Sequence, residues 1–181
     1  PQPRRFPRAI GLVLALLLLT ARPAGAALFD TDTELGLSLE LPLDSLLHDK
    51  KTQRRELPAS VSYVEADGRK VTVPVEVSIR GNTRANLCDL PPLRIDVKRK
   101  RAAGTLLESH DELKLVTQCK DSHRYRDYLL LEYKIYQAYN LVTSLSLRTR
   151  LLSVTYVDTD GEIRSFTQPA FVVEDIGEAA R

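Results

Sequence analysis

Residues 112–142 read ELKLVTQCKDSHRYRDYLLLEYKIYQAYNLV and decide the fold, because they join a short strand, a polar turn and the one long helix that the sequence predicts. At 100° per residue, one side of this helix is apolar. Its residues are Tyr128, Leu131, Ile135, Ala138, Tyr139 and Val142, flanked by Tyr125, Leu129 and Tyr136. We expect this face to be buried. Asp121 or Ser122 is expected to cap the first turn.

Glu132 is the exception on this helix, since the same count places it inside the apolar arc. A buried carboxylate is costly unless a cation or hydrogen-bond donors meet it. The helix therefore requires a positive partner from a neighbouring strand.

The remainder of the chain is dominated by strand patterns. Alternation is clearest from Val71 to Ile79, where Pro74 suggests an edge strand or a bulge. Further strands are expected near residues 35–41, 59–65, 93–97, 113–116, 152–156 and 163–173, and a helical turn or two near 43–51. The pattern predicts the α+β class, with an antiparallel sheet of about five to seven strands and one long helix packed on it.

The first 26 residues have the features of a secretory signal peptide, with arginines before an apolar run and Ala24-Gly25-Ala26 at the cleavage site. Export to the periplasm or the extracellular space is expected, with membrane contact only during export. Removing four arginines and no acidic residue changes the net charge from +2 to −2, which argues against a nucleic-acid-binding domain. We expect an N-terminal extension with strands at residues 27–70 and the main domain at residues 71–181.

Cys88 and Cys119 are the only cysteines, and in an exported chain such a pair is expected to form a disulfide. A reactive thiol is the alternative. His48, His110 and His123 lack metal-ligand spacing and are expected at the surface. The segment Asp158-Thr159-Asp160-Gly161 lacks the ligand spacing of a calcium loop and favours a hairpin turn. No metal site is predicted.

Two segments have both a functional and a structural interpretation. The turn formed by Arg80, Gly81, Asn82 and Thr83 could present backbone N–H groups and an arginine to an anion, or could simply be a turn. Lys114 could project from its strand toward Glu132, or could be an ordinary surface lysine.

The order of these segments resembles the small lobe of a protein-kinase-like fold, and specifically the CotH (spore coat protein H) kinase-like family, together with a related group of exported bacterial proteins. The matching segments, between about residues 71 and 176, are residues 80–83, 92–95, 113–116 with Asp121, and 171–175. The resemblance implies that Lys114 holds nucleotide phosphates and that Glu132 orients it. It also implies that Arg80–Thr83 lies on the phosphate side and that Glu174 belongs to the hinge near adenine. Lys98 competes with Lys114 for the lysine role.

The resemblance further implies ATP and Mg²⁺ as cofactors and phosphoryl transfer as the activity of a full-length protein. The catalytic residues of such enzymes lie in a C-terminal lobe after the hinge, so we expect this chain to be a fragment whose partner is that missing lobe. The alternative is a non-catalytic binding or structural module of the cell envelope, in which Arg80 and Glu132 form a buried ion pair.

Overall fold

The computed structural model describes residues 27–48 and 55–179. Strands account for most of the elements in these two ranges. In chain order the elements are β1 (Leu35–Leu41), α1 (Leu43–His48), β2 (Leu57–Val64), β3 (Lys70–Ile79), α2 (Thr83–Leu87), β4 (Leu93–Val97), α3 (Arg99–Ala102), β5 (Glu112–Thr117), α4 (His123–Val142), β6 (Thr149–Asp158), β7 (Phe166–Val173) and α5 (Ile176–Ala179). The predicted signal peptide lies outside the described residues.

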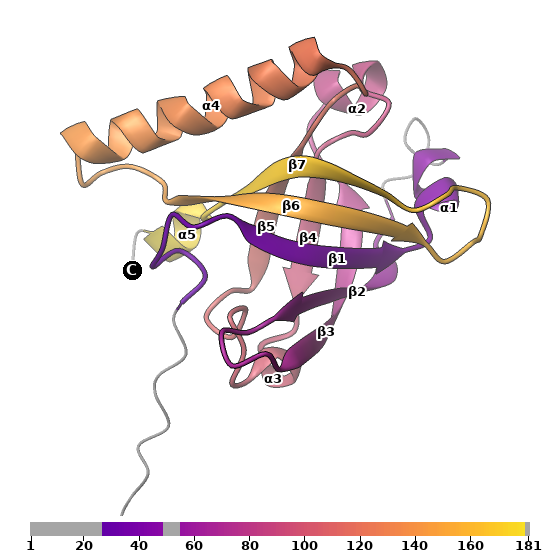
Figure 1. Cartoon of the computed structure of the whole chain (residues 1–181), viewed down its shortest axis with the longest axis horizontal. Coiled ribbons are helices and arrows are strands. Elements are labelled where there is room, and N and C mark those ends of the chain that lie inside the picture. The colour runs from indigo at the N-terminus through magenta and orange to yellow at the C-terminus, as the bar shows by residue number, and fades with distance from the viewer. Residues whose placement is uncertain (1–26, 49–54, 180–181) are drawn as a thin grey trace, which may run out of the picture.

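The strands form one closed barrel in the order β1-β2-β3-β4-β5-β7-β6 (Figure 1). The α+β class and the upper strand number are confirmed, but the sheet is a barrel rather than an open layer. Closure comes from β1 lying parallel to β6, with Leu35 opposite Leu152 and Leu41 opposite Asp158. All other neighbours are antiparallel. The strands of residues 27–70 thus share the barrel with the strands that follow them.

Alternating strand residues fill the barrel with one apolar core. Val73 and Val77 of β3 and Leu93 of β4 are fully buried in it. Pro74 of β3 pairs with Ser60 of β2, but the pairing of β3 with β4 begins only at Val75. Because Pro74 has no neighbour on β4, its lack of an N–H costs no hydrogen bond to that strand.

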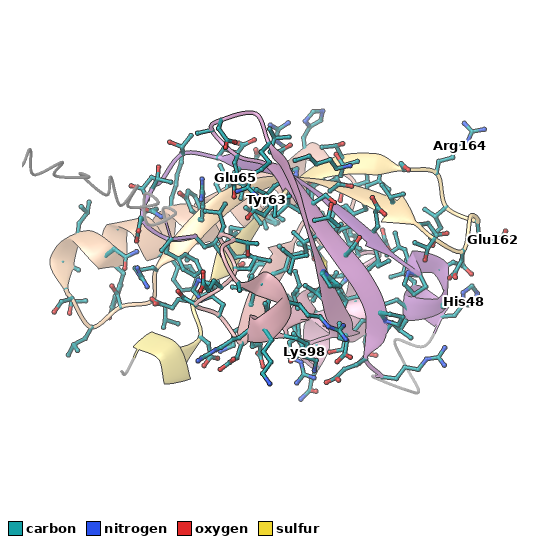
Figure 2. All side chains as sticks on the ribbon, turned by 90° about the horizontal axis from the view of Figure 1, so that it is seen from below. His48, Tyr63, Glu65, Lys98, Glu162 and Arg164 are labelled. Carbon is teal, nitrogen blue, oxygen red and sulfur yellow. A yellow bond between two sulfur atoms is a disulfide. The ribbon has the colours of Figure 1, made fainter. Side chains whose placement is uncertain are left out.

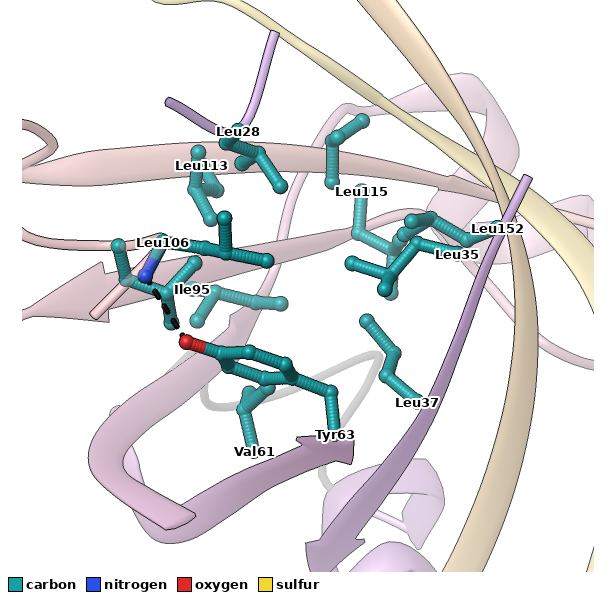
Figure 3. A pocket seen from close by; sticks show the side chains of 12 residues that line it. Leu28, Leu35, Leu37, Val61, Tyr63, Ile95, Leu106, Leu113, Leu115 and Leu152 are labelled. Carbon is teal, nitrogen blue, oxygen red and sulfur yellow. Dashed lines mark hydrogen bonds between the residues drawn. The ribbon is translucent and has the colours of Figure 1, made fainter. Parts of the chain in front are cut away.

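Near the end where β1 begins, the barrel interior keeps a cavity of about 20 Å³, little more than one water molecule needs. Apolar side chains line it, and the Tyr63 hydroxyl accepts a 2.8 Å hydrogen bond from the Leu106 N–H at its edge (Figure 3). The buried Arg150 guanidinium donates to the carbonyls of Leu28 and Thr33, which fastens the N-terminal segment to β6. The barrel is therefore a packed core and not a ligand chamber.

Helix α4 lies outside the barrel and contacts β6 and β7 (Figure 1). The buried seam consists of Leu129, with Tyr133 and Tyr136 packed on Phe171. The predicted buried face is wrong. Its large residues are more than half exposed: Tyr128, Leu131, Ile135, Tyr139 and Val142. The reason is that the barrel offers only a narrow apolar patch at Val116, Phe171 and Val173, which one edge of the helix covers.

Ser122 occupies the N-cap position of α4, but its side chain makes no capping hydrogen bond. The Asp121 carboxylate instead accepts a 3.3 Å hydrogen bond from Gln168 on β7. Among the helices that the structure describes, none is both long and apolar enough to cross a bilayer.

Candidate functional site

Lys114 lies on the outer face of β5, because its neighbours Leu113 and Leu115 point into the barrel core. Its Nζ is 2.6 Å from Oδ2 of Asp175, and the two side chains are only 18% and 28% exposed. Asp175 follows β7, whose Val173 pairs directly with Lys114. The register of two adjacent strands thus brings the ammonium and this carboxylate together.

Glu132 has a different partner, Arg84 on α2. Arg84 Nη2 is 2.8 Å from Glu132 Oε2, and the side chains are 50% and 33% exposed. The expected pairing of Glu132 with Lys114 is therefore not formed. The alternative pairing of Glu132 with Arg80 is not formed either. The helical turn of α2 instead directs Arg84, four positions later in the chain, toward α4. Glu132 does have its cation, but in a half-exposed pair at the surface.

Arg80, Gly81, Asn82 and Thr83 form the turn between β3 and α2. Gly81 has φ = 79°, a conformation that favours glycine, and Thr83 opens the helix. The Arg80 N–H donates to the Pro92 carbonyl, which joins this turn to the start of β4. Just beyond α2, Cys88 is bonded to Cys119 ahead of α4, so the predicted disulfide is confirmed. This bond fixes the turn and α2 beside the beginning of α4.

Glu174 is buried and bound by Arg148. Arg148 Nη2 lies 2.6 Å from Glu174 Oε1, and the Arg148 N–H donates to Oε2. Burial opposes the charged form of this carboxyl, but the Arg148 hydrogen bonds and charge prevail and lower the pKa of Glu174. Arg148 therefore holds both oxygens of this carboxylate.

Lys98, the competing lysine, projects outward beyond the end of β4 (Figure 2). It is half exposed and pairs with Glu76 at 3.0 Å. The hydrogen bond and charge of Glu76 raise the pKa of Lys98. Its salt-bridge partner therefore comes from β3 and not from the segment around α4.

The predicted site residues fall into two groups. Lys114 and Glu174 lie near the end of β7 with Asp175 and Arg148, whereas Arg80–Thr83 and Glu132 lie near α2 and α4 with Arg84. Three of these partners were not predicted from the sequence: Arg84, Asp175 and Arg148. Asp175 and Arg84 stand within a few residues of predicted positions, but spacing alone could not choose between neighbouring charges.

The histidine prediction is wrong for His110, which is buried with its ring 5.2 Å from the ring of Phe29. Within the described parts of the chain, no three His, Cys, Asp or Glu residues cluster as metal ligands. Asp158, in the predicted hairpin turn, binds backbone N–H groups: Leu43 and Asp160 donate to Oδ1, and Glu162 and Ile163 to Oδ2. It serves as an acceptor that organises the turn and the start of α1.

In comparisons with known proteins, no family model, no curated protein and no solved structure matches this chain.

Proposed function

We propose that this chain is the nucleotide-binding part of an exported CotH-like protein that transfers phosphoryl groups from ATP with Mg²⁺. The observation that carries the proposal is the position of Lys114. Its partly buried ammonium is held by the Asp175 carboxylate. Its strand, β5, directly precedes α4, the helix that bears Glu132. A strand lysine and a helix glutamate are the pair with which kinase-like proteins position nucleotide phosphates.

Nucleotide binding would require an exchange of ion pairs. Lys114 would leave Asp175 for phosphate oxygens, and Glu132 would leave Arg84 to orient Lys114. The second step costs little, because a half-exposed surface pair contributes only about 0–1 kcal/mol. The catalytic aspartates and the ligands of Mg²⁺ are assigned, in this proposal, to a further lobe after the hinge at residues 173–176.

Export is part of the same proposal. The Cys88–Cys119 bond supports it, since structural disulfides persist mainly in oxidising compartments such as the periplasm and the extracellular space.

Acylation of lysines in the presence and absence of ATP with Mg²⁺ tests the proposal on the chain as it stands. We expect the nucleotide to protect Lys114 from acylation, as read by mass spectrometry of tryptic peptides. Lys98 is the control, because it also forms a salt bridge with a carboxylate but lies outside the site. Equal labelling of Lys114 with and without millimolar nucleotide would contradict the assignment.

The second candidate is a non-catalytic binding module, which the exposed side of α4 favours. Tyr128, Leu131, Ile135, Ala138 and Val142 follow the spacing of a coiled-coil seam. The four large members are between 57% and 78% exposed. Such a stripe matches a second helix with the same spacing, and the α4 of a second copy provides one. In this case the chain would self-associate without nucleotide.

A further inference from the structure

We propose that a groove beside the disulfide binds an arginine side chain presented by an apolar peptide. The groove has a volume of about 400 Å³ and lies at the barrel end where β6 finishes and β7 begins. This volume falls within the range of about 300–1,000 Å³ found for ligand pockets. The groove lies away from the Lys114–Asp175 pair, and the proposed nucleotide binding does not use it.

The floor of the groove is apolar. Leu43 and Leu90 are buried beneath it, while Leu47, Ile163 and Phe166 are only partly buried and expose apolar surface to it. These side chains come from α1, the segment before β4 and the β6–β7 hairpin. Because partly exposed apolar surface gains free energy when a ligand covers it, the floor favours an apolar ligand body.

The rim of the groove is rich in hydrogen-bond acceptors. Asp89 and Asp121 are exposed carboxylates at its border. Asp121 Oδ1 accepts a 3.3 Å hydrogen bond from Gln168 Nε2, which leaves its second oxygen for a ligand. Gln168 Oε1 is buried and has no hydrogen-bond partner among the described residues. An unpaired buried acceptor is costly, so a donor from a ligand would relieve it.

Gln118 contributes another acceptor. The residue is only 4% exposed, and its Nε2 donates to the Lys120 and Ser122 carbonyls. These contacts direct the amide nitrogen to the backbone. With the nitrogen held there, the amide oxygen is the polar atom that Gln118 can offer to a ligand in the groove.

Lys120 is the only cation among the described residues that line the groove, and its Nζ lies over the Tyr125 ring at 5.9 Å. Two carboxylates and one lysine give the lining a net negative charge. The ligand should therefore be a cation with several donors. A guanidinium meets this requirement better than an ammonium, because its planar set of five N–H groups can bond a carboxylate and an amide oxygen together. Apolar residues beside the arginine would cover the floor.

The test uses three short capped peptides, Leu-Arg-Leu, Leu-Lys-Leu and Leu-Gln-Leu, titrated into the folded protein by isothermal calorimetry or NMR. We expect Leu-Arg-Leu to bind about tenfold more tightly than Leu-Gln-Leu, with Leu-Lys-Leu between them. The double variant Asp89→Asn with Asp121→Asn should lose about tenfold in affinity for Leu-Arg-Leu. Both aspartates are exposed, so the variant should fold, which its melting temperature verifies.

Glu162→Gln is the matched control. Glu162 lies in the loop that joins β6 and β7 (Figure 2) but is not among the residues that line the groove. It removes one negative charge nearby and should leave the affinity unchanged. Equal binding of the arginine and glutamine peptides would overturn the proposal, and so would unchanged affinity in the double aspartate variant or no binding at millimolar peptide.

Discussion

Arg84 on α2 and Glu132 on α4 form a salt bridge of 2.8 Å. The Cys88–Cys119 bond adds a second link nearby, because it joins the residue after α2 to the segment that leads into α4. The salt bridge also occupies the carboxylate that a kinase-like site would direct at Lys114. The position of this one arginine therefore decides whether Glu132 is available.

Arg84→Ala should change nucleotide binding more than stability. We expect a stability loss of no more than about 1 kcal/mol, because the pair is half exposed. If Glu132 orients Lys114, releasing it should increase the protection of Lys114 by ATP severalfold. The measurement is the acylation of Lys114 over a range of ATP concentrations. Glu132→Gln is the companion variant, since it should decrease that protection. Identical protection in the wild type and both variants would remove Glu132 from the site.

Replacing both Cys88 and Cys119 by Ser should lower the free energy of unfolding by about 3–4 kcal/mol. The estimate follows from the loop entropy of a crosslink across 31 positions. Urea unfolding of the wild type and the double variant measures the difference. Reduction of the wild type provides an internal check, because the reduced protein should unfold at the same urea concentration as the variant. A variant as stable as the oxidised wild type would show that the bond does not constrain the unfolded chain.

Asp158→Asn should destabilise the protein by about 1–3 kcal/mol at neutral pH, because an amide cannot accept all the N–H groups that the two oxygens now accept. Burial opposes ionisation of Asp158, but the N–H groups of Ile163, Asp160, Asp44 and Leu43 outweigh it and lower its pKa.

The pH dependence of this effect follows from the lowered pKa. The stabilisation by Asp158 is complete above the ordinary aspartate pKa of about 4 and is lost as the pH falls through the lower folded-state pKa. Urea unfolding from pH 7 to pH 2 should therefore show the wild type and Asp158→Asn converging at low pH. Glu162→Gln, in the loop that follows Asp158, should show no comparable loss at pH 7. A constant difference across the pH range would show that ionisation of Asp158 does not contribute.

Strands were predictable because alternation is a local property. From Val71 to Val77 every second side chain is buried, as the spacing predicts, and only Ser78 departs from the alternation. Barrel closure was not predictable in this way. It depends on β1 lying beside β6, more than a hundred residues later in the chain, and nothing in the spacing of Leu35 to Leu41 specifies that neighbour. The sheet's alternation is the same whether its edges are free or joined.

The helix shows a second limit of local patterns. Periodicity identified an apolar side of α4, but burial depends on the area that the barrel presents. Phe171 and Val116 accept Leu129 and Tyr133, and no described surface covers Leu131 or Ile135. Ion pairing also depends on which elements are neighbours in the fold. Lys114 meets Asp175 only because β5 and β7 are adjacent.

Leu129 and Leu131 provide a matched pair for testing the two sides of α4. Leu129→Ala should cost about 2–5 kcal/mol of stability, because only 4% of this side chain is exposed and its removal leaves a cavity against Phe171 and Val116. Leu131→Ala should cost little, because 57% of its surface already faces solvent.

Leu131→Glu should leave the monomer folded and abolish self-association through the exposed stripe. Sedimentation velocity over a range of concentrations measures that association, and thermal unfolding measures stability. A wild type that stays monomeric at high concentration would reject the α4 pairing, while a stable Leu129→Ala variant would contradict the observed seam.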